Sequence, residues 1–174
     1  SMGTVIVVTS GKGGTGKTSL TGGVASCLAA LGKTVLCLDA DIGLRNLDIS
    51  LGLSDRALMD FSDVALGRCP LARGAVDHPD VKGLSLLTAP MSLSPSLTID
   101  KVRAMLDTAR GQYDYILIDS PAGLGAGFRL AICGADRALV IATNDASSLR
   151  DAQRTVCELE SIRQVHLIMN RIQP

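Results

Sequence analysis

The glycine-rich stretch at residues 11–18 restricts what this chain can fold into more than any other part of the sequence. It reads Gly-Lys-Gly-Gly-Thr-Gly-Lys-Thr and fits the G-x-x-x-x-G-K-S/T pattern of a phosphate-binding P-loop. The β-branched run 5–8 before it predicts a buried strand, and the Ala- and Leu-rich run 19–31, closed by Gly32, predicts a helix. This order aims backbone N–H groups and a helix N-terminus at one point, which suits a polyphosphate.

Two lysines and a threonine of this loop have separate expected roles. Lys17 is expected to bring its charge to the β- and γ-phosphates, and the Thr18 hydroxyl to bind Mg²⁺. Lys12 is unusual for a P-loop, and it is either a solvated surface residue or a second phosphate contact. The predicted nucleotide-binding set of the loop is Gly11, Lys12, Gly13, Gly14, Thr15, Gly16, Lys17, Thr18 and Ser19.

Two acidic residues follow the next predicted strand, the apolar run 34–38. Strand, helix and strand within about 35 residues form a βαβ unit, so the two strands should be parallel. Ligands of such sheets lie beyond the carboxyl ends of the strands, which puts Asp39 and Asp41 beside the P-loop. One carboxylate can orient the attacking water while the other, Asp39, helps to hold hydrated Mg²⁺; either acid alone is also typical of a simple turn.

A third acidic residue follows a later predicted strand. The run 115–118 is apolar and ends in Asp119, which is the Walker B pattern of a carboxylate that holds the magnesium also touched by Thr18. The pattern alone is weak, because many buried strands end in Asp, and it gains weight from the P-loop upstream. The segment 121–127 behind it is interpreted as a nucleotide-sensing switch rather than as a plain loop into a helix.

The rest of the sequence alternates between predicted strands and helices, as in an α/β protein. Further strands are predicted at 84–88, 138–142 and 165–169, with short helices at 60–66 and 70–75. A helix with Thr98 as N-cap runs to Gly111. Another is capped by Ser147 or Ser148 and carries one apolar face: Leu149, Ala152, Val156 and Leu159. The expected fold is a doubly wound, mostly parallel sheet with helices on both faces, and residues 1–174 form a single P-loop NTPase domain.

Composition limits the class of protein and its partners. The 174 residues are 47% hydrophobic and 20% charged, as expected for a soluble globular domain. Aromatic residues are only 2%, which argues against stacking platforms for nucleic-acid bases. The 17 basic and 17 acidic residues balance, so no overall charge attracts the chain to DNA or anionic lipid. DNA is therefore not an expected partner.

The cysteines and the first residues give further expectations. Five single cysteines without a C-x-x-C pair predict reduced thiols in a cytosolic protein, while an iron–sulfur or zinc site stays open without a supporting spacing. No apolar run approaches the roughly 18 residues of a transmembrane helix. No signal peptide is visible, and Ser1 ahead of Met2 is interpreted as an expression scar.

Three blocks of sequence resemble one known family: 11–18, 41–48 and 119–123. The loop with the additional Lys12 is similar to the deviant Walker A signature of the MinD and ParA ATPases, which belong to the SIMIBI class of P-loop NTPases. The blocks 41–48 and 119–123 resemble the MinD type, and 41–48 differs from ParA. Such chains continue with more sheet and a C-terminal amphipathic helix, whereas this sequence stops at Pro174.

The resemblance implies roles for particular residues. Asp41 would serve hydrolysis together with the catalytic lysines, Lys17 and Lys12, the latter reaching the ATP of the other subunit of a dimer. Asn46 would lie in switch I, and Pro121 and Gly123 in switch II, whose backbone senses the γ-phosphate. Asn170, followed by Arg171, would contact the adenine edge, although Asn170 is also typical of a turn.

The resemblance also implies a function. The chain would bind ATP or ADP with Mg²⁺ and hydrolyse ATP slowly to switch an ATP-dependent homodimer that controls septum placement. MinC- and MinE-like proteins would be its partners, and the protein would be cytoplasmic, and peripheral at the inner face of the cell membrane through the C-terminal helix. Alternatives are a flagellar-number regulator, a ParA-type DNA partition ATPase, an iron–sulfur carrier scaffold of the same superfamily, and a nucleotide-binding regulator that no longer hydrolyses.

Overall fold

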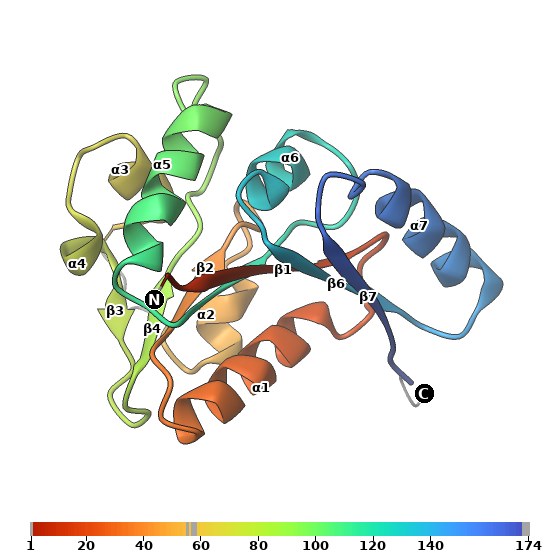
Figure 1. Ribbon diagram of the computed structural model, residues 1–174, viewed down its shortest axis with the longest axis horizontal. Coiled ribbons are helices and arrows are strands. Elements are labelled where there is room, and N and C mark those ends of the chain that lie inside the picture. The colour runs from red at the N-terminus through yellow and green to blue at the C-terminus, as the bar shows by residue number, and fades with distance from the viewer. Residues whose placement is uncertain (1, 55, 57–58, 172–174) are drawn as a thin grey trace.

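A single seven-stranded sheet organises the chain (Figure 1). The computed structural model describes residues 2–54, 56 and 59–171, so the interpretation of Ser1 lies outside the described residues. The strand order is β3-β4-β2-β5-β1-β6-β7, and all neighbours are parallel except β3 and β4. The strands are β1 (Thr4–Ser10), β2 (Val35–Asp39), β3 (Val76–Asp77), β4 (Leu84–Leu87), β5 (Tyr115–Asp119), β6 (Arg137–Ala142) and β7 (Gln164–Met169).

Helices cover both faces of the sheet. The helices are α1 (Lys17–Ala30), α2 (Asn46–Ser50), α3 (Phe61–Ala65), α4 (Leu71–Gly74), α5 (Ile99–Arg110), α6 (Ala126–Ile132) and α7 (Ala146–Cys157). In Figure 1, α1 and α2 lie below the sheet and the other helices above it. Two apolar clusters fill these layers, one with Leu47 of α2 and one with Phe128 of α6. The predicted doubly wound α/β fold is confirmed.

Strand register brings the ends of three strands to one edge. Asp119 at the end of β5 pairs with Val8 of β1 on one side and with Asp39 of β2 on the other. Because β1, β2 and β5 run in parallel, the P-loop after β1 and the acids that end β2 and β5 meet there. The predicted βαβ unit is confirmed, and it positions the site.

Several local expectations need correction. Helix α1 begins at Lys17 and not at residue 19, so Lys17 and Thr18 belong to its first turn and Gly16 (φ 83°) is its N-cap. The sheet has one strand more than the six expected, because the two-residue β3 adds to β4 in antiparallel fashion. Helix α2 was not expected, because the segment around Asn46 was interpreted only as a switch surface.

Helix α7 differs from its expected cap and face. Its N-cap is Asp145, whose carboxylate accepts from the Ser148 backbone N–H at 2.8 Å, so a cap by Ser147 or Ser148 is wrong. The buried side chains of the helix are Ser148, Ala152 and Thr155, while Leu149 and Val156 are 37% and 39% exposed. Of the expected apolar face, Ala152 and Leu159, which lies two residues beyond the helix end, are confirmed as core residues, whereas the positions of Leu149 and Val156 are wrong.

Candidate functional site

A cavity of about 420 Å³ opens over the carboxyl edge of the sheet. Its walls come from the P-loop, the start of α1 and the two predicted switch segments. The lining residues are Ser10, Gly13, Gly14, Thr15, Gly16, Lys17, Thr18, Ser19, Asp41, Leu44, Asn46, Pro121 and Ala122. Most of the residues predicted from the sequence are therefore gathered around one space. Leu44 and Ala122 were not singled out, although each lies inside a block that carried the family resemblance.

Asp119 is the point on which two P-loop side chains converge. Lys17, which is 8% exposed, forms an ion pair with Asp119 Oδ1. The Thr18 hydroxyl donates to Asp119 Oδ2 at 2.8 Å. Both carboxylate oxygens of a fully buried acid are thus engaged by adjacent residues of α1. A buried charge requires such partners. The geometry therefore places the Lys17 ammonium group and the Thr18 hydroxyl at the floor of the cavity.

Asp39 is the group that best tests whether a metal ion fits here. It is fully buried; its Oδ1 accepts from the Asp41 backbone N–H at 2.9 Å, and its Oδ2 has no partner among the described residues. The pKa of Asp39 is raised to about 7, mainly because burial disfavours its charged form; the hydrogen bond from Asp41 opposes this shift, and the negative charge of Asp119 adds to it. An orphaned buried carboxylate oxygen beside a second acid suits a cation.

The chemistry of the donors favours magnesium held indirectly. Among the described residues, no group of three or more Asp, Glu, His or Cys side chains is placed to hold a metal ion by itself. Mg²⁺ usually keeps several waters and is bound through one or two carboxylates together with substrate phosphates. Thr18, Asp39 and Asp119 fit that pattern and would hold the ion together with phosphate and water.

Asp41 differs from the other two acids because it lines the cavity. Burial raises the pKa of this carboxyl, the charge of Lys17 lowers it and that of Asp119 raises it, with a net upward shift. Asp41 thus stands beside the phosphate-facing lysine with a carboxylate open to the space where a nucleotide would lie. That position suits a group that orients water.

Two glycines of the loop are required by close approaches. A Cβ at Gly11 would lie 2.4 Å from the Cβ of Asp151 on α7, and a Cβ at Gly16 would lie 2.4 Å from Asn170 Nδ2. The same Asn170 amide donates to the Thr15 carbonyl oxygen at 2.8 Å. The P-loop is therefore packed between α7 and the end of β7.

The predicted adenine contacts and Lys12 lie around the cavity rather than in its lining. Among the described residues, Asn170 braces the back of the loop, and Arg171 is exposed beside it. Lys12 Nζ donates to Asp145 Oδ1 at 3.3 Å, and its side chain is 38% exposed. Asp145 was missed as a partner of Lys12. It follows the end of β6, which is parallel to β1, and an acid just beyond the carboxyl end of such a strand is expected near the P-loop, as Asp39 was.

The switch residues divide between the cavity and its surroundings. Asn46, the first residue of α2, and Pro121 both line the cavity. Gly123 (φ 86°) lies outside the lining, between Pro121 and the start of α6. The switch segments thus reach the nucleotide site through residues 41, 44, 46, 121 and 122.

Comparisons with known proteins agree with this geometry. The model of a family described as an AAA domain matches residues 3–172. The septum site-determining protein MinD of Helicobacter pylori is 44% identical over 99% of this chain and 68% of its own length. MinD in the MinC:MinD cell division protein complex of Aquifex aeolicus is 45% identical, with a TM-score of 0.88 over 98% of this chain and 69% of that one.

A further solved structure carries a nucleotide in its title. The septum site-determining protein MinD of Pyrococcus horikoshii, complexed with Mg-ADP, is 27% identical, with a TM-score of 0.84 over 97% of this chain and 70% of that one. The chain spans about two thirds of the length of the curated relatives it matches. The comparisons do not favour the flagellar, ParA-type or iron–sulfur alternatives. From the P-loop cavity, the fold and these likenesses we conclude that the chain belongs to the family of the septum site-determining protein MinD.

Proposed function

We propose that this chain is a Mg-ATP-binding switch ATPase that hydrolyses ATP slowly, and that residues 1–174 act as one ATPase domain. The convergence of Lys17 and Thr18 on Asp119, at the floor of a cavity walled by both switch segments, carries this proposal. The Mg-ADP complex of the Pyrococcus horikoshii relative supports adenine nucleotide and magnesium as the ligands.

Each residue at the cavity has a task that follows from its position. Lys17 leaves Asp119 to face the phosphates, while the backbone N–H groups of residues 13–19 surround them. Thr18, Asp39 and Asp119 would hold a magnesium ion, and the ion would supply positive charge for the phosphate oxygens. Asp41 orients the attacking water from the cavity wall. Asn170 and Arg171 lie outside the cavity lining, and the proposal that they contact the adenine rests on the family resemblance and not on their contacts here.

We also propose an ATP-dependent homodimer in which Lys12 contacts the nucleotide of the partner subunit. Lys12 is partly exposed and its hydrogen bond to Asp145 is long, so little energy keeps it on its own subunit. The neighbouring glycines 13 and 14 have open space where a Cβ would stand, so a second molecule can approach closely.

At the level of the cell, we propose control of division-site placement. The names of the relatives and the MinC:MinD complex of Aquifex aeolicus support a MinC-like partner. A MinE-like partner and peripheral attachment to the inner face of the cell membrane are further parts of this proposal. Among the described residues, no helix has both the length and the apolar character needed to cross a membrane.

Calorimetric titration with Mg-ATP tests the nucleotide site. We expect Lys17→Ala to lower ATP affinity by roughly 10- to 150-fold, the range of a lost hydrogen bond to a charged group. Lys33→Ala, an exposed lysine beyond the far end of α1, is the matched control and should leave affinity unchanged. Equal affinity in Lys17→Ala and wild type would mean that this loop is not a working P-loop.

A further inference from the structure

The segment that carries Asp41 is tied to the chain that follows strand β4. Three polar contacts make this connection, and each partner on the β4 side belongs to residues 88–90. They are Gly43 N to the Pro90 carbonyl at 3.1 Å, Arg45 Nε to the Ala89 carbonyl at 3.1 Å, and the Thr88 hydroxyl to the two Asp48 carboxylate oxygens at 2.7 and 2.8 Å. Residues 41–48 are therefore held from outside the nucleotide cavity.

The Thr88–Asp48 contact is the buried one of the three. Thr88 is fully buried and Asp48 is 4% exposed. Burial raises the pKa of Asp48, while the Thr88 hydrogen bond and the Arg45 charge lower it. Asp48 also lies in the first turn of α2, where a helix N-terminus favours a carboxylate. Because the Asp48 carboxylate is buried and has few hydrogen-bond donors, the loss of any one of them would strongly destabilise it.

Helix α2 needs such an anchor. It has five residues, far fewer than an isolated helix requires to be stable in water. Its N-cap, Arg45, is held at φ 51°, a region that residues with a side chain adopt only when their surroundings impose it. Asn46 directly after it lines the cavity. The position of this cavity wall therefore depends on the contacts that fix α2.

We propose that Thr88 and Asp48 are positioning residues that hold switch I, and with it Asp41, in the geometry required at the P-loop. Neither side chain lines the cavity, so they act through α2 and not on the nucleotide. The hydroxyl of Thr88 locks the carboxylate of Asp48, and breaking this bond frees residues 43–51 to leave the cavity wall. The consequence for hydrolysis rests on the proposed function; the effect on the mobility of the segment does not.

Hydrogen exchange of the nucleotide-free protein tests the anchor directly. Thr88→Val removes the hydroxyl and keeps the shape, and we expect exchange of the amides in residues 43–51 to accelerate roughly tenfold or more because a buried acceptor loses its donor. Thr88→Ser keeps the hydroxyl and should restore wild-type exchange. Thr155→Val is the matched control, since Thr155 is 1% exposed and its hydroxyl donates to the Asp151 carbonyl of the same helix. Unchanged exchange in Thr88→Val, or equal acceleration in the control, would overturn the proposal.

A second variant covers the case in which Thr88→Val fails to fold. Asp48→Asn keeps the size of the side chain and leaves an uncharged, weaker acceptor for the Thr88 hydroxyl. We expect a smaller acceleration, about threefold, confined to residues 43–51. Wild-type exchange in that segment would equally contradict an anchoring role.

Steady-state kinetics separates positioning from general destabilisation. In Thr88→Val we expect kcat for ATP to fall about tenfold while ADP affinity stays within about twofold of wild type, because the P-loop is untouched. Thr88→Ser should recover most of the rate. A fall in ADP affinity equal to the fall in kcat would contradict positioning. If wild type itself does not hydrolyse ATP, the proposed function fails, and the exchange experiment still decides whether Thr88 anchors switch I.

Discussion

Asp39, Asp41 and Asp119 are three acids of one cavity region with different surroundings. Asp119 is bound by Lys17 and Thr18, Asp39 is buried with one oxygen that has no partner in the described part of the chain, and Asp41 faces the cavity. Removing each acid should therefore have a different effect. The effects on hydrolysis and on nucleotide binding should differ most between variants of Asp41 and of Asp119.

We predict that Asp41→Ala keeps ATP affinity and lowers hydrolysis by roughly 10²-fold or more, as for a lost group that handles the attacking water. Asp119→Ala should instead weaken nucleotide binding in the presence of Mg²⁺, because Thr18 and the ion lose their shared carboxylate. Nucleotide titrations with and without Mg²⁺, together with phosphate release, distinguish the two variants. Equal loss of binding in both would remove the distinction.

Gly11 gives a second prediction at this scale. A Cβ there would lie 2.4 Å from the Cβ and 2.5 Å from the backbone carbonyl carbon of Asp151, so α7 would have to shift. We predict that Gly11→Ala lowers the free energy of unfolding by about 1–3 kcal/mol, the usual range for overpacking. Gly13→Ala is the control, because nothing lies within 4 Å of its added Cβ. Urea denaturation of both variants measures the difference, and equal stability would refute the packing argument.

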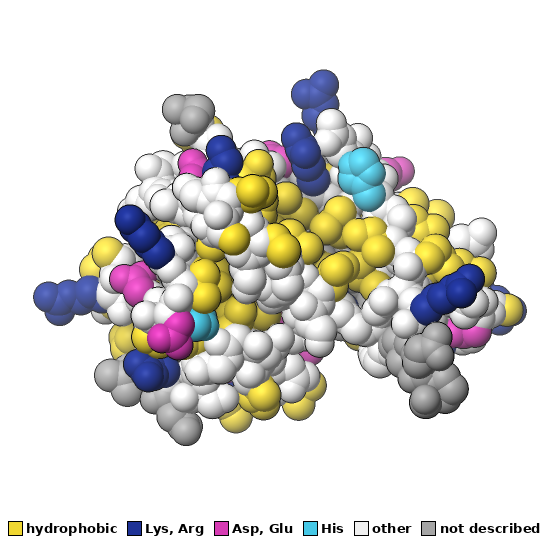
Figure 2. Space-filling model, turned by 90° about the horizontal axis from the view of Figure 1, so that it is seen from below, with side chains coloured by type: hydrophobic (Ala, Val, Ile, Leu, Met, Phe, Trp, Pro, Cys, Tyr) yellow, Lys and Arg dark blue, Asp and Glu magenta, His cyan; other side chains and the backbone are white. Residues whose placement is uncertain are grey.

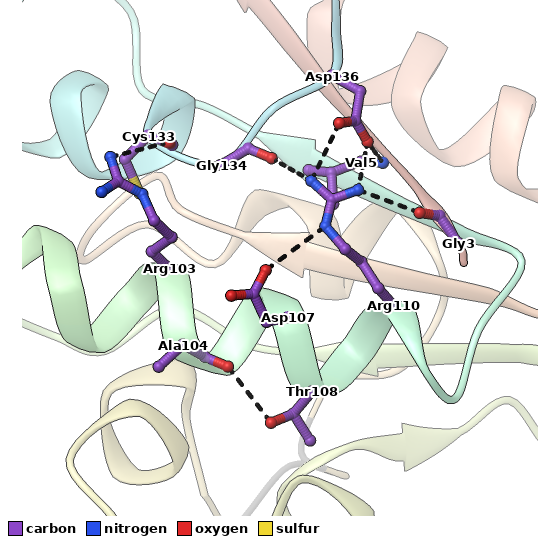
Figure 3. A network of polar contacts seen from close by, with 10 residues as sticks. All are labelled: Gly3, Val5, Arg103, Ala104, Asp107, Thr108, Arg110, Cys133, Gly134 and Asp136. Atoms are coloured by element: carbon purple, nitrogen blue, oxygen red, sulfur yellow. Dashed lines mark hydrogen bonds and ion pairs between the residues drawn. The ribbon is translucent and has the colours of Figure 1, made fainter.

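Among the elements, α5 is fastened to the start of β1 and to the connection before β6 by its last residue, Arg110 (Figure 3). Its guanidinium donates to the Gly3 carbonyl at 3.1 Å and the Gly134 carbonyl at 2.7 Å, and pairs with both Asp136 oxygens at 2.5 and 3.1 Å. Asp136 also accepts from the Val5 N–H at 2.8 Å. One side chain thus joins three elements that are far apart in the sequence.

This network predicts a pH dependence of stability. Burial alone would raise the pKa of Asp136, but the hydrogen bonds from Arg110 and Val5 and the nearby positive charges lower it overall. Because the folded pKa lies below the unfolded one, near 3.9, this stabilisation is present above the unfolded value and is lost as pH falls through the folded pKa. Solvent exposure of Asp136 keeps the effect modest.

We therefore predict that Asp136→Asn is less stable than wild type at pH 7 and that the gap narrows as pH falls below about 4. Asp107→Asn is the control, because Asp107 is 68% exposed and its contact with Arg110 is 3.8 Å. Urea denaturation at several pH values from neutral to acid provides the measurement. A gap that stays constant across this range would show that ionisation of Asp136 does not matter.

For the whole molecule, the distribution of charge and the exposed loop determine how it meets other molecules. Figure 2 shows one face, on which Lys and Arg side chains are scattered around the outline rather than gathered in a patch. This agrees with the zero net charge and gives no support to DNA binding through that face. The lysine with a proposed role in association is Lys12.

We predict that the protein is mainly monomeric with ADP and dimeric with ATP when Asp41→Ala blocks hydrolysis. Adding Lys12→Ala should abolish that dimer and leave the monomer folded, because a point charge that meets the phosphates of the partner subunit is lost. Light scattering with saturating Mg-ATP compares the two variants, with Lys33→Ala in the same background as control. A Lys12→Ala double variant that still dimerises would confine Lys12 to its own subunit.

The sequence by itself determined the parts of the fold that are encoded locally. The P-loop pattern, the apolar runs and the acids at their ends predicted where the nucleotide site lies, because parallel strands place their carboxyl ends at one edge. Asp39 and Asp119 could be placed together in this way without any knowledge of their contacts. The capping of the helix after Thr98 was equally readable, because its side chain accepts from the Lys101 N–H three residues later.

Only the tertiary structure decided which distant residues meet. Asn170 braces Thr15, Lys12 pairs with Asp145, and Thr88 holds Asp48, over separations of 155, 133 and 40 residues. No local periodicity marks such pairs, since each depends on how elements pack and not on their own pattern. The two-residue β3 escaped prediction because it is too short to carry a pattern of its own, and its neighbour β4 imposes its conformation. The five-residue α2 escaped because no capping side chain marks its start: its N-cap is Arg45, whereas the equally short α3 begins with a capping box at Asp60.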